Sequence, residues 1–300
     1  MAGRNAILSA YELSALTRLF SSSVIQELAR KGRSPLLRRL SSASRLALRC
    51  STSARVRDLF ETAFTILNSA GRRDEYIYRS ALTHKVLLGK HSLRTAAMLS
   101  EFRVGNCRAD AVILNGSSAA YEIKSERDSL FRLAQQVEQY RRVFASVNVI
   151  ASDSHIGAIS TVAPMDVGIL RLNARYQIST EREAHVRPDG ICPVAVFDSL
   201  RSDEAILILS GLGIEAPNLP NTQLRGAMRA LFSDLEPVAV HQQMVETLKV
   251  TRDLTPLCEL VERLPKSLHA AILSTPIRKA DHKRLTDAVH TPLSEAEKWV

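Results

Sequence analysis

The fold is decided by one stretch, "RADAVILNGSSAAYEIKS", which covers residues 108–125. Two short apolar runs in it are separated by Asn115-Gly116, and an Asn-Gly pair in that setting is a strong local signal for a β-hairpin. The second run carries Glu122 and Lys124, although a buried strand ordinarily carries no charge. The stretch therefore predicts a hairpin whose second strand presents an acid and a base on one face.

Short apolar runs and helical patterns continue on both sides of this hairpin. The expected elements are a strand at 99–105 before it, then a helix at about 128–145 and strands at 147–152, 167–172 and 176–186. Strands and helices in the order β-β-β-α-β, after leading helices, predict an α/β fold with a mixed sheet.

Helices are expected at both ends of the chain, at 10–31, 56–68, 75–91 and again from about Leu200 onward. The sequence therefore predicts three parts. They are a basic helical segment at 1–57, the sheet-containing domain at 58–195 and a C-terminal helical domain at 196–300.

The excess positive charge lies near the amino terminus. The chain has a net charge of +9, and residues 1–57 alone hold 11 lysines and arginines against the acids Glu12 and Glu27. Three interpretations fit: a nucleic-acid footprint, a solvated basic helix face, or a transit peptide. The helical spacing of residues 15–32 favours a folded basic segment.

The compartment and the metal chemistry are bounded by composition. The cysteines Cys50, Cys107, Cys192 and Cys258 are scattered, which favours a reducing, cytoplasmic setting and predicts no zinc site. No apolar run approaches the roughly 18 residues of a membrane span, so no membrane partner is expected.

Strand geometry places the charged side chains of the hairpin together. Glu122 and Lys124 lie two residues apart and therefore share a face. A three-residue loop pairs Leu114 with Ser118 and hence Asp110 with Glu122, whereas an even-length loop would send Asp110 to the opposite face.

A further acid, Glu101, lies one strand earlier, and a Gly105-Asn106 turn can bring it alongside Asp110. Three converging carboxylates would repel one another unless they are protonated, paired or bound to a metal. Lys124 can pair with one of them. Oxygen ligands without His or Cys select Mg²⁺ or Mn²⁺, which lowers the pKa of a bound water and stabilises charge on a phosphate oxygen.

Glu101, Asp110 and Glu122-Ile123-Lys124 resemble the motif of the PD-(D/E)xK nuclease superfamily. The segment is also similar to a family of largely uncharacterised bacterial proteins with this nuclease core. The resemblance implies a restriction-endonuclease-like α-β-β-β-α-β core, metal binding by the acids and a lysine that assists the attacking water.

A second motif lies on the expected helix. Gln136 and Tyr140 match the Q-x-x-x-Y element of the RecB-like branch, and the resemblance implies that both support the site. Two departures stand out. Asp110 follows Ala109 instead of a proline, and many members carry the first acid on the leading helix, which nominates Glu61 in place of Glu101, with Glu75 as a weaker candidate.

The first hypothesis is therefore a Mg²⁺- or Mn²⁺-dependent nuclease that cuts phosphodiester bonds, with DNA as the expected partner and bacterial defence as a role by analogy. The alternative is a nucleic-acid-binding or assembly subunit with the same fold and little activity alone. The interpretation without a functional site is an edge strand with a surface ion pair. The sequence leaves open DNA against RNA, endo- against exonuclease action, and whether the chain works with a protein partner or as a homo-oligomer.

Overall fold

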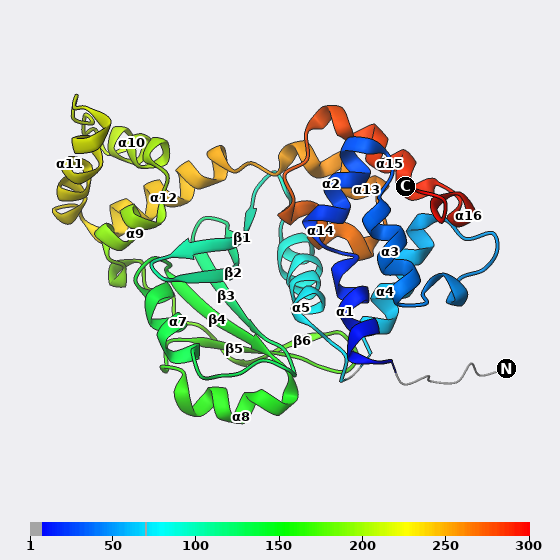
Figure 1. The fold of residues 1–300 in the computed structure, drawn as a ribbon. Coiled ribbons are helices and arrows are strands. Elements are labelled where there is room, and N and C mark those ends of the chain that lie inside the picture. The colour runs from blue at the N-terminus through cyan, green and yellow to red at the C-terminus, as the bar shows by residue number, and fades with distance from the viewer. Residues whose placement is uncertain (1–7, 70) are drawn as a thin grey trace. The chain divides into compact units, whose positions relative to one another are not determined.

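A six-stranded mixed sheet is flanked by helices in the middle part of the sequence, so the predicted α/β class is confirmed (Figure 1). The computed structural model describes residues 8–69 and 71–300. Residues 1–7 of the predicted basic segment therefore lie outside the described residues.

The strands lie side by side in sequence order. They are β1 (Ala97–Val104), β2 (Cys107–Leu114), β3 (Ser118–Lys124), β4 (Ser146–Ala151), β5 (Gly168–Leu172) and β6 (Ile178–Arg182). The pairs β1–β2, β2–β3 and β5–β6 are antiparallel because short turns join them, while β3–β4 and β4–β5 are parallel because helices provide the crossovers. The predicted strand 176–186 is thus confirmed as a partner of β5.

The two hairpin turns have the geometry that the sequence predicts. Gly105, with φ of +55°, allows a two-residue turn in which Val104 pairs with Cys107. The second loop contains three residues, and Leu114 pairs with Ser118 as expected. This register ends at the pair Ala111 and Tyr121, so the expected ladder pair of Asp110 and Glu122 is not formed.

The crossover helices are α7 (Leu133–Arg141) and α8 (Asp153–Val162). Two successive crossovers in the same direction along the sheet place both helices on one face. Helix α7 is shorter than predicted because bonds between Asp128 and Ser125 hold the preceding residues in a loop. Helix α8 was not predicted, since of its residues only Ile159 is fully buried and the apolar pattern is weak.

Four further helices pack on the same sheet unit. They are α9 (Pro193–Ser199), α10 (Ser202–Gly211), α11 (Asn221–Ser233) and α12 (Pro237–Thr251). Phe197 of α9 and Met244 of α12 share one buried core with Val112 and Val147 of the sheet. These helices bury their apolar faces on strands, so they belong with the sheet.

A buried ion pair fastens α10 to α12. Glu204 is fully buried, and its carboxylate accepts from Arg252 Nε at 2.8 Å and Nη2 at 3.0 Å. The Arg252 guanidinium also lies over the Phe102 ring of β1, 5.0 Å from its centroid. Burial opposes the charge of Glu204, but the arginine keeps the pKa of that carboxyl below its ordinary value.

The chain divides into two compact units, a sheet unit of residues 81–255 and a helical unit of residues 1–80 and 256–300. This division differs from the predicted boundaries after 57 and 195. The predicted C-terminal helical domain is split, because α9–α12 pack on the sheet while the later helices pack with the N-terminal ones.

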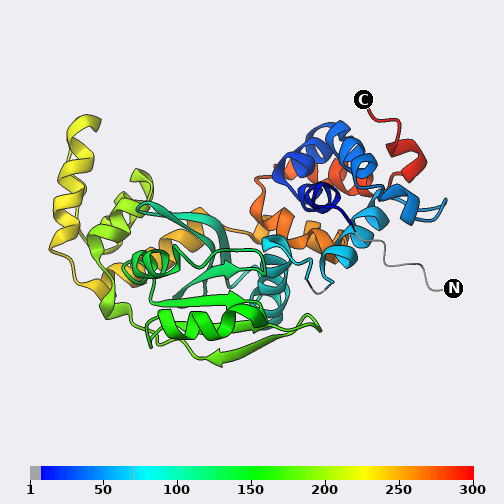
Figure 2. The same ribbon diagram turned by 60° about the horizontal axis from the view of Figure 1, so that its bottom comes forward.

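The helical unit is built from both ends of the chain (Figure 2). Its helices are α1 (Ala10–Arg18), α2 (Ser22–Lys31), α3 (Pro35–Ala43), α4 (Val56–Leu67), α13 (Cys258–Arg263), α14 (His269–Ser274), α15 (His282–His290) and α16 (Leu293–Ala296). Helix α2 packs against α15 and α14, and α4 packs against α15 and α16. An isolated bridge between Arg55 and Pro292 also joins the two segments.

The predicted N-terminal helices are present with interruptions. The expected helix at 10–31 is broken between α1 and α2, and Gly32, with φ of +69°, ends α2 as predicted. The expected helix at 75–91 is α5 (Glu75–Leu82), a π-turn at Thr83–Leu87 and α6 (Leu88–Lys90). Among the described residues, every helix is too short or too polar to cross a lipid bilayer.

Stability of the sheet unit should depend on pH through His241. Its buried ring lies 3.0 Å from Ser118 Oγ, and burial lowers its pKa below the ordinary 6.5. The unfolded chain binds a proton there more readily, so stability is complete above pH 6.5 and falls as the pH drops below it, by at most about 1.4 kcal/mol per pH unit. Urea unfolding between pH 7.5 and 5.5 should show a smaller loss for His241→Gln than for the parent; equal losses would contradict this assignment.

Candidate functional site

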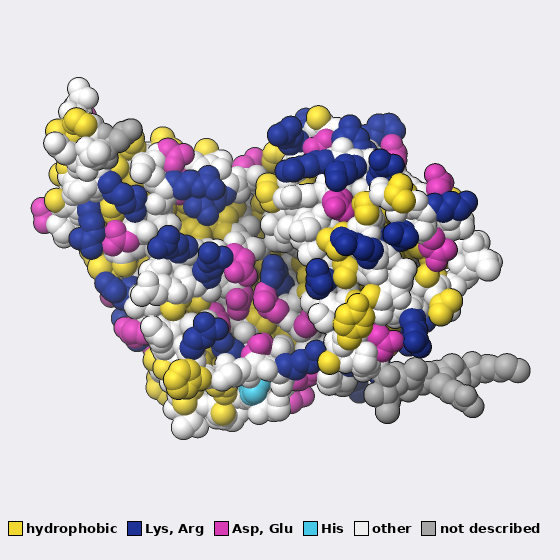
Figure 3. Space-filling model, in the orientation of Figure 1, with side chains coloured by type: hydrophobic (Ala, Val, Ile, Leu, Met, Phe, Trp, Pro, Cys, Tyr) yellow, Lys and Arg dark blue, Asp and Glu magenta, His cyan; other side chains and the backbone are white. Residues whose placement is uncertain are grey.

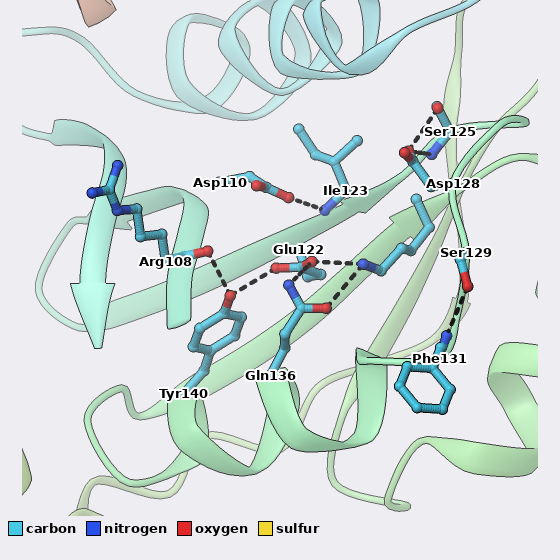
Figure 4. A network of polar contacts seen from close by, with 11 residues as sticks. Arg108, Asp110, Glu122, Ile123, Ser125, Asp128, Ser129, Phe131, Gln136 and Tyr140 are labelled. Carbon is cyan, nitrogen blue, oxygen red and sulfur yellow. Dashed lines mark hydrogen bonds and ion pairs between the residues drawn. The ribbon is translucent and has the colours of Figure 1, made fainter. Parts of the chain in front are cut away.

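The end of strand β3 carries a buried charged network, which answers why Glu122 and Lys124 stand in a strand (Figure 4). Both residues are buried, with 2% and 6% of their surfaces exposed. Lys124 Nζ donates to Glu122 Oε1 at 2.8 Å. The two charges compensate each other in a setting where a single buried charge would be costly. The interpretation of these residues as an exposed surface ion pair is therefore wrong.

Helix α7 supplies the remaining donors to this carboxylate. Gln136 Nε2 donates to Glu122 Oε1 at 2.5 Å, while Gln136 Oε1 accepts from Lys124 Nζ at 3.0 Å. Tyr140, one turn later, donates to Glu122 Oε2 at 2.8 Å. The Q-x-x-x-Y residues thus lie where the sequence placed them, facing the E-x-K residues.

Tyr140 links three elements of the sheet unit. Its hydroxyl lies 2.6 Å from the main-chain oxygen of Arg108 in β2 as well as beside Glu122 in β3. Burial, and then the negative charge of Glu122, raise the pKa of Tyr140 well above its ordinary value. The phenol therefore stays protonated and acts as a hydrogen-bond donor at physiological pH.

Asp110 reaches strand β3 by its side chain. The β2–β3 ladder gives way beyond the pair Ala111 and Tyr121, and Asp110 Oδ2 accepts from the main-chain N–H of Ile123 at 2.6 Å. The carboxylate thus stands at the place where the two strands separate, and its bonding partner is the residue that follows Glu122. Tyr121 is also buried, and strand alternation places its side chain on the face opposite to that of Glu122.

Glu101 lies beside Asp110, and a carboxylate oxygen of each lies within 4.8 Å of the other. Glu101 is exposed and has φ of +54°, a left-handed conformation inside strand β1. For a residue other than glycine this conformation costs roughly 1–2 kcal/mol. The expected closeness of Glu101 and Asp110 is confirmed; the sequence carried no signal for the strained backbone.

The same position interrupts the alternation of both strands. Leu99 and Phe102 of β1 enter one core although their positions differ by three, whereas residues on one face of a regular strand differ by an even number. The same holds for Ala109 and Val112 of β2. The paired residues skip from Phe102 to Ser100, so Glu101 is left out of the ladder. The register of β1 and β2 is the same on both sides of this gap, so Glu101 and Asp110 are left out of the ladder at the same level of the sheet.

The six predicted residues therefore form two groups joined through β3. Glu122, Lys124, Gln136 and Tyr140 are bonded to one another, and Asp110 with Glu101 forms the second group. The bond from Ile123 to Asp110 connects them. Main-chain groups of Arg108 and Ile123 complete the site, and side-chain patterns could not have identified these.

The alternative leading acid has a structural role in the helical unit. Glu61 Oε1 accepts from Ser267 N at 3.3 Å and from Ser267 Oγ at 2.9 Å. It therefore holds α4 to the start of the short helix at Lys266–Leu268. Glu75 forms an ion pair with Arg79 one turn later. Between Glu101 and Glu61, Glu101 is the residue that lies beside Asp110.

The loop between β3 and α7 is ordered and open. Asp128 accepts from Ser125 N at 2.8 Å and Oγ at 2.6 Å. Neither residue caps α7, because this helix begins at Leu133 and has Arg132 at its N-cap position. Arg127 and Arg132 are exposed, and the ring of Phe131 is 92% exposed next to the start of α7. The arrangement thus combines a buried, pre-formed network with accessible residues beside it.

Removing both members of the buried pair should cost less stability than the two single removals added together. Lys124→Met leaves Glu122 charged and buried, and we expect a loss of about 3–5 kcal/mol of unfolding free energy. The double variant Glu122→Gln with Lys124→Met should lose less than the sum of the two single losses. Urea unfolding of the four proteins measures this coupling. Strictly additive losses would show that the pair is not held as described.

The backbone at Glu101 should reverse the usual order of small residues in strands. Because φ is positive, Glu101→Gly should be more stable than Glu101→Ala by about 1 kcal/mol. Arg103, exposed in the regular part of β1, serves as the matched control, where alanine should be the more stable. Thermal or urea unfolding of the four variants tests this, and the same order at both positions would refute a left-handed Glu101.

Comparison with known proteins gives one family. The family model described as "Bacteriophage P4 protein cII" matches residues 68–252, which include all six site residues and the whole sheet. A curated relative, "Protein cII" of Enterobacteria phage P4, is 34% identical over 90 residues, which is 29% of this chain and 34% of the relative. The match thus spans about a third of that protein. No solved structure matches this chain. On the extent of the family match, the chain belongs to the bacteriophage P4 protein cII family.

Proposed function

We propose that the sheet unit is a metal-dependent nuclease that hydrolyses phosphodiester bonds of nucleic acid, with DNA as the expected substrate. The observation that supports it best is the environment of Glu122. Its carboxylate is bonded to Lys124, Gln136 and Tyr140 at the point where Asp110 reaches β3. These are the residues of both motifs that resemble the PD-(D/E)xK superfamily.

The donor set fits a hard divalent cation such as Mg²⁺ or Mn²⁺. Glu101 and Asp110 offer carboxylate oxygens within 4.8 Å of each other, and the described donors are oxygens without histidine or thiolate. Glu122 accepts three hydrogen bonds, and a carboxylate has about four acceptor sites, so one remains for a cation. We therefore assign Asp110, Glu101 and Glu122 as the ligands. When bound, the ion supplies positive charge against the charge that develops on the phosphate.

The residues of this chain have separable tasks in such a reaction. Lys124 is the cation nearest the Glu122 carboxylate, and its ammonium can orient a water molecule toward a phosphorus atom or donate to a phosphate oxygen. Gln136 bonds to both Lys124 and Glu122 and so fixes their separation. Tyr140 is a positioning residue, because it holds Glu122 against the main chain of β2.

A second candidate function is binding of nucleic acid with little cleavage by the chain alone. The observation that favours it is that three internal donors already bond to Glu122, which stabilises the site in a form that needs no ion. A partner or substrate would then have to open this network. Titration calorimetry with Mn²⁺ separates the two functions, since a catalytic site should bind the ion through Asp110.

The biological setting is also part of the proposal. The family takes its description from a phage protein, so we place the activity in the biology of bacteriophages. The role in bacterial defence is proposed by analogy alone. Action on DNA inside the cytoplasm stays a prediction.

Purified protein with Mg²⁺ or Mn²⁺ should nick or degrade plasmid DNA, and EDTA should stop it. Asp110→Asn and Lys124→Ala should reduce the rate by at least about a hundredfold, because they remove a ligand and the water-orienting cation. Gel assays under single-turnover conditions measure the rate. Glu101→Gln should lose activity while Glu61→Gln retains it, since Glu61 belongs to the helical unit. Undiminished cleavage by both Asp110→Asn and Lys124→Ala would refute the proposal.

A further inference from the structure

The net charge of the protein lies wholly in the helical unit. Residues 1–80 and 256–300 contain 21 lysines and arginines and 12 acids, whereas residues 81–255 contain 19 of each. Arginine predominates at the amino terminus, where ten of the 11 cations of residues 1–57 are arginines. Arginine presents a planar pair of donors that matches phosphate oxygens, so this composition favours a phosphate-bearing partner.

Part of this charge gathers where the two terminal segments meet. Helix α2 packs against α15, and a hollow of about 240 Å³ between the segments is lined by Arg30 of α2 and Arg278 of the C-terminal segment. We define the terminal basic face as the exposed residues at and beside this hollow. They are Arg30, Lys31, Arg33, Arg278, Lys279 and Lys283. Figure 3 shows lysine and arginine side chains gathered over α2 and α15.

Internal contacts account for only a small part of these cations. Arg284, which is not counted in the face, donates to the Ala29 and Arg30 carbonyl oxygens at the end of α2 and to Asp281. Arg284 therefore supplies hydrogen-bond donors to the carbonyl oxygens at the end of α2 by itself. Within the face, Lys283 is paired with Asp287. Burial, and then the positive charge of Lys279, lower the pKa of His282, while the carboxylates of Asp281 and Glu259 oppose this shift.

The exposed side chains of the helical unit indicate whether single-stranded or duplex nucleic acid would bind. Proteins that bind single strands stack bases on exposed aromatic rings. Among the described residues of the helical unit, Tyr11 is the one strongly exposed aromatic, and its helix α1 lies outside the terminal basic face. Contacts made by cations alone reach the phosphate backbone and carry no base sequence.

We propose that the terminal basic face binds the phosphate backbone of duplex nucleic acid, independently of base sequence. The face is assembled by residues from both ends of the chain and is separate in the sequence from every residue of the candidate nuclease site. This inference does not depend on cleavage. It gives the protein a second contact with nucleic acid, on a unit that holds none of the candidate catalytic residues.

The test is binding of the full chain to a fluorescent 20-base-pair duplex in EDTA, with anisotropy measured from 50 to 300 mM salt. The triple variant Arg33→Gln, Arg278→Gln, Lys279→Gln should bind at least about tenfold more weakly at 100 mM salt, and the slope of log K against log salt should fall by about 3. Arg284 is left intact because it holds α2 to α15.

The matched control removes three exposed cations at the other end of α15. Val56, the first residue of α4, bonds to Thr291 there, so Arg55→Gln, Arg57→Gln, Lys298→Gln changes the same net charge about 14 Å along the helix. This control should keep most of the affinity and slope. Equal losses in both triple variants, no loss in either, or tighter binding to a single strand of the same length would overturn the proposal. So would retention on phosphatidylserine vesicles without duplex binding. Loss of cleavage in Asp110→Asn with intact duplex binding would leave it standing.

Discussion

The site depends on one constraint, which is that the carboxylate of Glu122 is charged and buried inside a sheet. Burial of an isolated carboxylate is so costly that partners must be supplied from the surrounding structure. Lys124 comes from the same strand, two residues on, while Gln136 and Tyr140 come from α7. The position of α7 across the sheet is therefore tied to the chemistry of β3 as well as to the packing of apolar side chains. A helix rotated by a few tens of degrees would leave the acid without the two donors that α7 supplies.

Much of this arrangement could be predicted because local turn geometry fixes strand parity. The three-residue loop after Leu114 determined which residues pair across the hairpin, and the two-residue turn at Gly105 brought Glu101 to Asp110. The helical spacing of Gln136 and Tyr140 was equally decisive, because residues four apart lie on one face. In each case the information lay within a few residues of the side chain concerned.

The features that escaped prediction depend on main-chain groups or on distant packing. The left-handed backbone at Glu101 and the slip in alternation beside it leave no mark in residue types. Arg108 and Ile123 take part through main-chain groups that every residue type shares, so no sequence motif could reveal their role. The assignment of α9–α12 to the sheet required knowing which apolar surface they cover, and amphipathic spacing shows only that some surface is covered.

The two units differ in electrostatic character, one balanced and one strongly basic. The sheet unit, whose charges balance, can gather acids around a cation without binding polyanions non-specifically. The basic helical unit can hold a polyanion without taking part in catalysis. Separation of the two properties avoids a conflict, since carboxylates needed for a metal repel the phosphates that a substrate must bring.

The insertion of the sheet unit into the helical unit also sets an order of events during synthesis. Residues 8–69 are synthesised before residues 256–300, which contain their apolar partners on α14 and α15. The sheet unit can complete itself while these early helices wait with Val24, Ile25 and Leu28 uncovered. The nascent chain therefore exposes this apolar surface while residues 70–255 are being synthesised, and a chaperone that covers it would raise the yield of folded protein.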